Sequence, residues 1–250
     1  AGHGPGANHL DGDEGLAARS SLAGPDRRGR HPLPDPVAFA ARLGAMGIGD
    51  AHRVVAYDDV GGWVAARLWW MLDSLGHRSV AVLDGGIGAW TAAGFPLTTE
   101  VPAWPAERLT LAPSWSRTID RDALRARLGT VALLDARAAP RYRGEVEPID
   151  AVAGHIPTAR NAPADGNLVE AGGSFLAPDT LAARFAGLGA DGSAGRPVVS
   201  ACGSGVAACH NALAMRVAGL PDPLLYVGSY SDWTQNGFPV TAGAEPGAPP

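Results

Sequence analysis

The sequence predicts an α/β protein made of two tandem domains, each a mainly parallel sheet flanked by helices. The first observation is that short β-branched runs alternate with segments of helical periodicity, an order typical of parallel β/α units. The second is an internal duplication. The phrase Ala-Gly-His-x-Pro-x-Ala occurs at 1–7 and 153–159, and Trp-x-x-x-Gly-Phe-Pro occurs at 90–96 and 233–239. Two copies are too few for a solenoid and indicate a pair of similar domains.

The domain boundaries follow from composition. Residues 101–117 contain prolines at 102, 105 and 113 and show little periodicity, so this segment is predicted to form a linker. The N-terminal domain then covers 1–100 and the C-terminal domain 118–241. A tail of Gly, Ala, Pro and Glu at 242–250 is expected to be flexible.

In the first domain, residues 8–36 are polar and rich in Gly, Pro, Asp and Arg, so they are predicted to form a long loop. Asp35-Pro36 is expected to begin a helix, because proline is favoured in the first helical turn. The remaining elements expected in this domain are a buried strand at 53–57, an amphipathic helix at 63–75, a strand at 79–83 and a short helix at 87–93.

The second domain repeats the alternation. Its charged residues between 141 and 150 are predicted to form a loop. The elements expected here are helices at 120–128, 178–187, 206–217 and 230–236, and strands at 131–134, around 198–199 and at 224–227.

Composition restricts the function classes. The chain has 250 residues, of which 46% are hydrophobic and 18% charged, as in a globular protein. A net charge of −5 gives no general attraction to nucleic acid or to an anionic membrane, and no apolar run reaches the roughly 18 residues of a membrane span. Two cysteines make no disulfide framework. We therefore expect a monomeric, cytoplasmic protein with no metal, no cofactor, and no nucleic-acid or membrane partner.

The stretch that carries chemistry begins at Cys202. Val198 and Val199 suit a buried strand, Gly203 and Gly205 permit unusual loop angles, and an Ala- and Leu-rich helix follows. A cysteine just before a helix faces unpaired N–H groups and the positive end of the helix dipole, which favour the nucleophilic thiolate. The alternative is that Cys202 is a small buried apolar residue.

Only the second domain carries this nucleophile. When the two copies are aligned, Asp58 falls where Cys202 stands. A carboxylate cannot do thiol chemistry, so the first domain is expected to be catalytically inactive and to shape the cleft. It also lacks the helix and strand that precede Ala153-Gly154-His155 in the second copy. Two explanations are open: a native segment precedes Ala1, or this domain has lost a strand and has an exposed sheet edge.

Several phrases together resemble one family. They are Gly29-Arg30-His31-Pro32-Leu33-Pro34, Leu83-Asp84-Gly85-Gly86, Asp135-Ala136-Arg137, Arg141-Tyr142-Arg143-Gly144, Gly154-His155-Ile156-Pro157 and Cys202-Gly203-Ser204-Gly205-Val206. In this order they are similar to the tandem-domain rhodaneses, sulfurtransferases of the thiosulfate and 3-mercaptopyruvate type. Each phrase alone is weak, but together they span almost the whole chain.

The resemblance implies a ping-pong sulfur transfer. Cys202 takes a sulfane sulfur from a small anionic donor, forms a persulfide and passes the sulfur to cyanide or to a thiol, for example on a thioredoxin-like protein. A loop of small residues with inward N–H groups suits a persulfide anion. We therefore assign a substrate-binding role to Gly203, Gly205, Val206 and Ala207.

The resemblance also assigns side-chain roles. Arg141 matches the substrate-binding arginine and is expected to pair with a donor carboxylate or sulfonate; the alternative is a solvated charged loop. Gly203-Ser204 is typical of members that prefer 3-mercaptopyruvate, in which the serine works with a histidine and an aspartate of the first domain as a proton relay. The matching residues are His31 and Asp13, whose alternatives are a surface histidine and an ordinary loop acid.

Three departures from the family pattern bear on activity. Pro148-Ile149-Asp150 stands where a second arginine is usual, which weakens the assignment of 3-mercaptopyruvate over thiosulfate. The last loop position is usually threonine, and Ala207 has no hydroxyl to donate, a loss of about 1–3 kcal/mol. Tyr230 replaces the usual tryptophan. Reduced activity is therefore one expectation.

Two other functions compete with this interpretation. A cysteine phosphatase needs an arginine at the end of the loop, but position 208 is alanine and no arginine follows until Arg216. A degenerate rhodanese that binds a partner or carries persulfide without catalysis is the remaining alternative, because a fold alone does not fix a function.

Overall fold

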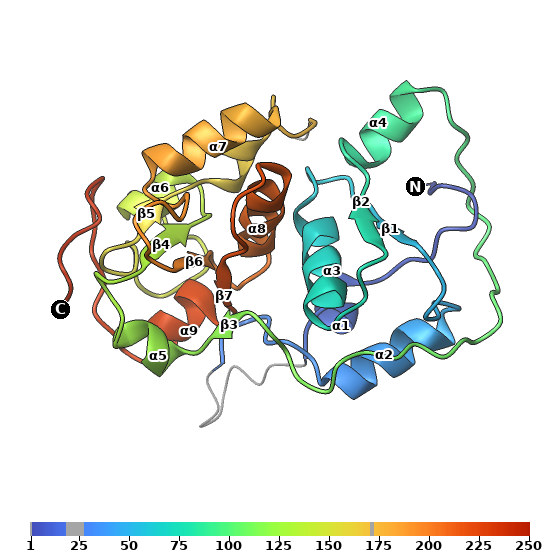
Figure 1. The fold of residues 1–250 in the computed structure, drawn as a ribbon, viewed down its shortest axis with the longest axis horizontal. Coiled ribbons are helices and arrows are strands. Elements are labelled where there is room, and N and C mark those ends of the chain that lie inside the picture. The colour runs from blue at the N-terminus through green and yellow to red at the C-terminus, as the bar shows by residue number, and fades with distance from the viewer. Residues whose placement is uncertain (1, 19–27, 171–172) are drawn as a thin grey trace.

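The computed structural model describes residues 2–18, 28–170 and 173–250 and confirms the tandem α/β plan. The two halves lie side by side, with the N-terminal domain on the right and the C-terminal domain on the left of Figure 1. Within the described residues, no helix combines the length and the apolar composition that crossing a bilayer requires.

The N-terminal domain is built on two parallel strands. β1 (Val54–Ala56) pairs with β2 (Val80–Val82), and Val54 lies opposite Val80. The expected strand here is buried on one face only, because the side chain of Val55 points away from the core and is 51% exposed.

Three of the helices of this domain lie where they were predicted: α2 (Pro36–Ala45), α3 (Trp63–Ser74) and α4 (Gly86–Ala92). Asp35 caps α2 through a bond from the N–H of Ala38, and Pro36 is its first residue. The loop predicted at 8–36 was wrong in one part, because it contains a short helix, α1 (Gly12–Gly15). Asp11 caps this helix by accepting from the N–H groups of Asp13 and Glu14; the part at 19–27 lies outside the described residues.

The C-terminal domain contains a five-stranded parallel sheet in the order β3-β7-β6-β4-β5. Its strands are β3 (Thr118–Ile119), β4 (Ala132–Asp135), β5 (Arg160–Asn161), β6 (Val198–Ala201) and β7 (Leu224–Tyr226). β6 is central and buried along its length, so its carboxyl end lies at the middle of the sheet edge.

Helices cover this sheet as predicted at α7 (Pro178–Gly187), α8 (Ala207–Val217) and α9 (Ser229–Gln235). α5 (Arg121–Arg125) is shorter than expected. The loop predicted at 141–150 begins inside a helix, α6 (Ala139–Arg143), because Pro140 stands in its first turn and Gly144 ends it in the left-handed conformation. A 3₁₀ turn at Ala164–Asn167 was not predicted.

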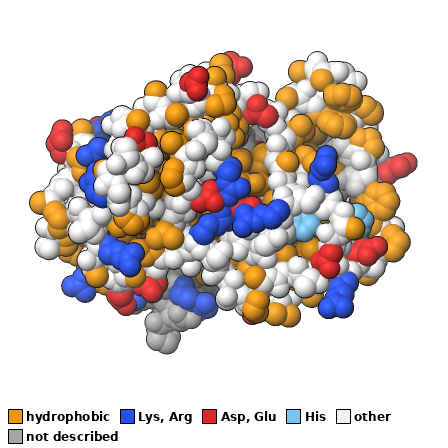
Figure 2. Space-filling model, in the orientation of Figure 1, with side chains coloured by type: hydrophobic (Ala, Val, Ile, Leu, Met, Phe, Trp, Pro, Cys, Tyr) orange, Lys and Arg blue, Asp and Glu red, His pale blue; other side chains and the backbone are white. Residues whose placement is uncertain are grey.

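The domains share a buried interface. α3 of the first domain packs along α8 of the second, and one hydrophobic cluster contains Trp70 and Leu72 of α3 together with Cys209 and Ala212 of α8. On the face drawn in Figure 2, basic and acidic side chains gather where the two halves meet. The carboxylate of Asp73, on α3, is buried and pairs with Arg78, Arg117 and Arg216.

The linker and the C-terminal tail lie against different domains. Residues 101–117 contain no regular element and run along the first domain, where the Trp104 indole donates to the carbonyl of Gly6. The tail at 242–250 lies against the second domain: the carbonyl of Pro246 accepts from the N–H of Thr158, and that of Glu245 bonds to His155 Nε2.

Candidate active site

Cys202 lies between the end of β6 and the start of α8, on the buried loop that the sequence predicted. Its Sγ accepts from the N–H of Gly205 at 3.1 Å and of Ser204 at 3.5 Å. Its own N–H is fixed by Ser229 Oγ at 3.0 Å. Gly205 has φ +82°, and a Cβ there would lie 2.4 Å from the carbonyl oxygen of Val227, so only glycine fits. The loop therefore presents inward N–H groups to the sulfur.

The corresponding loop of the first domain is filled by its own side chain. The Asp58 carboxylate accepts from the N–H groups of Val60, Gly62, Val64 and Ala65 at 2.7–3.0 Å. It thus caps α3, whose first residue is Trp63. A carboxylate occupies the loop position that the sulfur occupies in the second domain, and it leaves no nucleophile there.

Ser204, His31 and Asp13 form a chain of hydrogen bonds across the domain boundary. His31 Nδ1 lies 2.7 Å from Ser204 Oγ, and His31 Nε2 lies 3.0 Å from Asp13 Oδ1. Burial lowers the pKa of His31, although Asp13 opposes this shift, so the ring is neutral near pH 7. A carboxylate only accepts, so Nε2 carries the hydrogen and Nδ1 accepts from the serine hydroxyl.

Arg67 of α3 holds both sides of this arrangement. Its guanidinium is fully buried and donates to the carbonyls of Gly205 and His31, each at 3.0 Å, and at 3.4 Å to that of Leu16. One side chain of the first domain therefore fixes the cysteine loop of the second domain relative to the histidine.

Arginines lie beside the cysteine loop. A methyl group on Gly203 would lie 3.0 Å from Nη2 of Arg30 and 3.6 Å from Nη1 of Arg141. Arg137 stacks on the ring of Tyr230 at 3.7 Å and pairs with Asp135. Since Arg30 comes from the first domain, both domains contribute cations next to Cys202.

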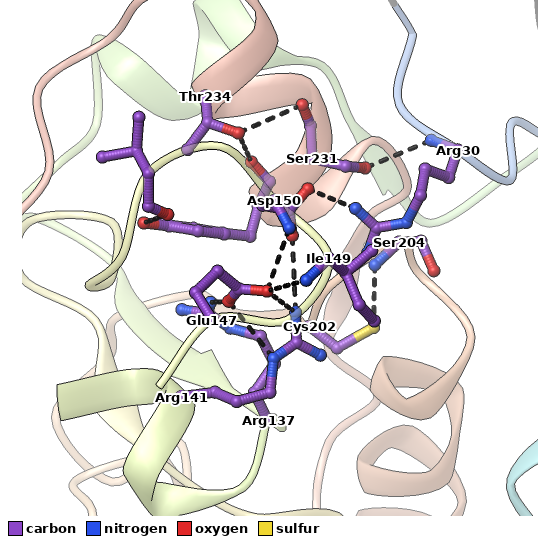
Figure 3. A network of polar contacts seen from close by, with 12 residues as sticks. Arg30, Arg137, Arg141, Glu147, Ile149, Asp150, Cys202, Ser204, Ser231 and Thr234 are labelled. Carbon is purple, nitrogen blue, oxygen red and sulfur yellow. Dashed lines mark hydrogen bonds and ion pairs between the residues drawn. The ribbon is translucent and has the colours of Figure 1, made fainter. Parts of the chain in front are cut away.

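These arginines are paired with two carboxylates of the loop after α6. Figure 3 shows Glu147 and Asp150 lying among Arg141, Arg137 and Arg30. Glu147 bonds to Arg141 at 2.5 Å and to Arg137 at 3.3 Å. Asp150 pairs with Arg30 and, at 3.4 Å, with Arg141. Burial alone would raise the pKa of Glu147, but bonds from Arg141 and from backbone N–H groups outweigh it and lower that pKa.

The structure brings Cys202, Ser204, His31 and Asp13 together in the order that the family resemblance suggested. Gly203, Gly205, Val206 and Ala207 complete the loop. Within the described residues, the N–H groups that donate to Sγ are those of Ser204 and Gly205. Arg141 lies beside the loop as expected, but with two carboxylates already on it. Sequence reasoning missed the roles of Arg30, Arg67, Glu147 and Asp150. The phrase around His31 contains Arg30, and Asp150 lies in the segment that replaces the usual second arginine, but neither signal indicated a contact.

Cys209, the other cysteine, lies in the first turn of α8. It is fully buried, its Sγ donates to the carbonyl of Gly205 at 3.4 Å, and burial raises its pKa to about 12. It is therefore a thiol at neutral pH and no competing nucleophile.

Comparisons with known proteins agree on one family. The Rhodanese-like domain family matches residues 1–93 and 120–236. The probable 3-mercaptopyruvate sulfurtransferase of Pseudomonas aeruginosa is 48% identical over 246 residues, which cover 94% of this chain and 85% of that protein. The thiosulfate sulfurtransferase of Bos taurus is 36% identical over 217 residues, 84% of this chain and 72% of that one. The crystal structure of the Escherichia coli 3-mercaptopyruvate sulfotransferase SseA superposes with a TM-score of 0.74 at 30% identity, covering 92% of this chain and 83% of that one.

Proposed function

The chain belongs to the rhodanese family, and on that premise we propose that it is a sulfurtransferase that moves a sulfane sulfur from 3-mercaptopyruvate or thiosulfate through a persulfide on Cys202. The observation that carries the proposal is the Cys202 loop, whose N–H groups point at Sγ while Ser204, in the same loop, bonds to His31. The names of two similar proteins, a probable 3-mercaptopyruvate sulfurtransferase and a thiosulfate sulfurtransferase, support this proposal.

In the first half-reaction the Cys202 thiolate attacks the donor sulfur. With thiosulfate the S–S bond breaks and sulfite leaves with the bonding electron pair. With 3-mercaptopyruvate the C–S bond breaks and its electron pair goes to carbon, giving the enolate of pyruvate. The product on the protein is Cys–S–S⁻ once the donor thiol has lost its proton, and the loop N–H groups are placed to hold the new negative charge.

The 3-mercaptopyruvate route needs a proton transfer that the thiosulfate route does not. The thiol proton must leave sulfur and the enolate carbon must gain one, so the net proton count is unchanged. Neutral His31 accepts from Ser204 and donates to Asp13, and this chain of bonds is suited to carry that proton. The relay therefore favours 3-mercaptopyruvate as the donor.

In the second half-reaction an acceptor attacks the outer sulfur of the persulfide. Cyanide takes the sulfur to form thiocyanate, or a thiolate of a small molecule or of a thioredoxin-like protein takes it to form a persulfide. In each case the S–S bond breaks and Cys202 regains its thiolate. We propose a monomeric cytoplasmic enzyme with residues 118–241 as the catalytic domain and 1–100 as an inactive partner domain that supplies His31, Asp13 and Arg67.

The test compares thiocyanate formation by the wild type, Cys202→Ser and the control Cys209→Ala. We expect no transfer by Cys202→Ser and near-normal transfer by Cys209→Ala, with a mass increase of one sulfur atom on the wild type after incubation with donor alone. Equal background rates for all three proteins would sink the enzyme and leave the degenerate, non-catalytic rhodanese, which the paired state of Arg141 and the missing hydroxyl at Ala207 favour.

A second variant tests the relay. His31→Asn should lower kcat/KM for 3-mercaptopyruvate about 10²-fold or more while changing it little for thiosulfate, because only the former needs the proton. His9→Asn removes an exposed histidine of the same domain and serves as the control. An equal loss with both donors would show that His31 only supports the fold of the site.

A further inference from the structure

The carboxylate of Asp150 lies between two guanidinium groups that come from different domains. Its Oδ1 pairs with Nη1 of Arg30, and its Oδ2 lies 3.4 Å from Nη2 of Arg141. The side chain is 4% exposed. Its own N–H donates to Glu147 Oε1 at 3.0 Å, which fixes the backbone at this position. Asp150 is thus a buried bridge between the two cations.

This bridge lies next to the nucleophile. The Arg30 and Arg141 guanidiniums lie within van der Waals range of a methyl group placed on Gly203, the residue after Cys202. A small donor whose sulfur reaches Cys202 must put its acidic group within a few ångströms, and these two guanidiniums are cations at that distance. The side chain of Asp150 therefore pairs with the same two arginines, Arg30 and Arg141, that the acidic group of the donor would reach.

The charges of the cluster balance. Three guanidiniums and three carboxylates make it up: Arg30, Arg137, Arg141, Asp135, Glu147 and Asp150. Asp135 and Glu147 are held by Arg137 and Arg141 through several bonds each. Asp150 is the carboxylate whose removal would give the cluster a net positive charge while leaving those two pairs intact.

We propose that Asp150 is a specificity-determining residue for the sulfur donor: its carboxylate competes with the donor's acidic group for Arg30 and Arg141 and selects against donors of high negative charge. The proposal rests on the sulfur-transfer function proposed above. It assigns to Asp150 a preference for a singly charged α-keto acid thiol over doubly charged thiosulfate. Repulsion from a fixed charge grows in proportion to the charge of the donor, so a dianion loses about twice the free energy that a monoanion loses.

Kinetics of Asp150→Asn test the selection. Asparagine keeps the size and an acceptor oxygen for Arg30 but removes the charge. We expect the KM for thiosulfate to fall about tenfold and that for 3-mercaptopyruvate about threefold, because half the charge gives half the change in free energy. The control is Glu145→Gln, which removes the same charge from the same loop at an exposed pair with Arg143 and should change neither KM.

A binding measurement separates this proposal from the function on which it rests. In the Cys202→Ser background, calorimetry with sulfate as the dianion and pyruvate as the monoanion requires no sulfur transfer. Asp150→Asn should tighten sulfate about tenfold and pyruvate about threefold relative to Cys202→Ser alone. If no protein transfers sulfur but these shifts appear, the proposed reaction fails and the role of Asp150 stands.

Two results would overturn the proposal. Unchanged binding of both anions, as in Glu145→Gln, would show that the Asp150 charge does not reach the donor site. Weaker binding of both, in a variant with the thermal stability of the wild type, would show that Asp150 positions the arginines for the donor instead of competing with it. A variant that loses its thermal transition can be replaced by Asp150→Ser for the same comparison.

Discussion

The carboxylate of Asp73 links the two domains, and its loss should be felt in the stability of the whole chain. Asp73 lies on α3 and is 3% exposed. It accepts from Arg78 at 2.9 Å, from Arg117 at 2.6 Å and from Arg216 at 3.1 Å. Arg216 stands in the last turn of α8, so the bridge ties the end of that helix to the first domain. The perturbation is Asp73→Asn, which keeps the shape and removes the charge.

The structure sets the size of the effect. Removing one partner of a buried ion pair costs about 3–5 kcal/mol. Here Arg117 and Arg216 each keep Asp222 as a partner, at 2.6 and 2.5 Å, and asparagine retains one acceptor. We therefore expect the lower limit, a loss of about 3 kcal/mol. At about 2–4 °C per kcal/mol for a chain of this size, Tm should fall by about 6–12 °C.

Denaturant unfolding followed by tryptophan fluorescence and by circular dichroism measures this loss. Glu145→Gln breaks an exposed ion pair with Arg143 and should leave the denaturation midpoint nearly unchanged, because exposed pairs contribute little to stability. If Asp73→Asn unfolds at the same denaturant concentration as Glu145→Gln, the bridge contributes nothing and the argument from burial is wrong. If the two probes separate in Asp73→Asn but coincide in the wild type, the bridge makes the two domains unfold together.

Three further predictions concern single groups. Burial lowers the pKa of His210 to about 4 from its ordinary value of 6.5, so between these two pH values the unfolded state binds one more proton than the folded state. The His210 contribution to stability should be complete above about pH 6.5 and should fall as the pH drops towards 4. His210→Gln should flatten this slope in unfolding titrations, and an unchanged slope would assign the pH dependence to other groups. Gly205→Ala should abolish thiocyanate formation, because its Cβ would lie 2.4 Å from a carbonyl oxygen at φ +82°. Gly203→Ala should lower it less, because its Cβ would meet arginine side chains and no backbone, the nearest atom being Nη2 of Arg30 at 3.0 Å. Measurable turnover by Gly205→Ala would show that the loop can relax. In the folded protein iodoacetamide should label Cys202 and leave Cys209 unmodified, because burial raises the Cys209 pKa to about 12, and mass spectrometry that finds label on Cys209 would contradict its burial.

The sequence predicted the elements whose signals are local. Apolar runs located β1, β4 and β6, helical periodicity located α3 and α7, and the Asp35-Pro36 start signal located α2. The two-residue strands β3 and β5 were missed because Thr118-Ile119 and Arg160-Asn161 have no periodicity, and partners far along the chain decide that they pair. α1 and α6 are too short to show a helical face, and their caps lie among charged residues that resemble a loop.

The site divides in the same way. The loop around Cys202 could be read from residue types, and the link of Ser204 to His31 and Asp13 came from the family resemblance, since the serine and histidine are 173 residues apart. Arg67 could not be found, because an arginine within a helix normally indicates the solvent face and only the other domain makes this one buried. The role of Asp150 was likewise hidden: it depends on Arg30, which reaches it from the other domain.

The guanidinium of Arg67 makes the duplicated halves of this chain inseparable. It belongs to the copy without a nucleophile, yet it is bonded to the carbonyl of Gly205 in the copy that has one. The fragment that follows a cut after residue 117 would keep Cys202 but lose Arg67, which bonds to its loop, together with His31. Either half made separately should therefore be inert, and mixing the two should restore transfer only to the extent that α3 and α8 find each other. The copy without a nucleophile is therefore part of the site, because Arg67 and His31 both come from it.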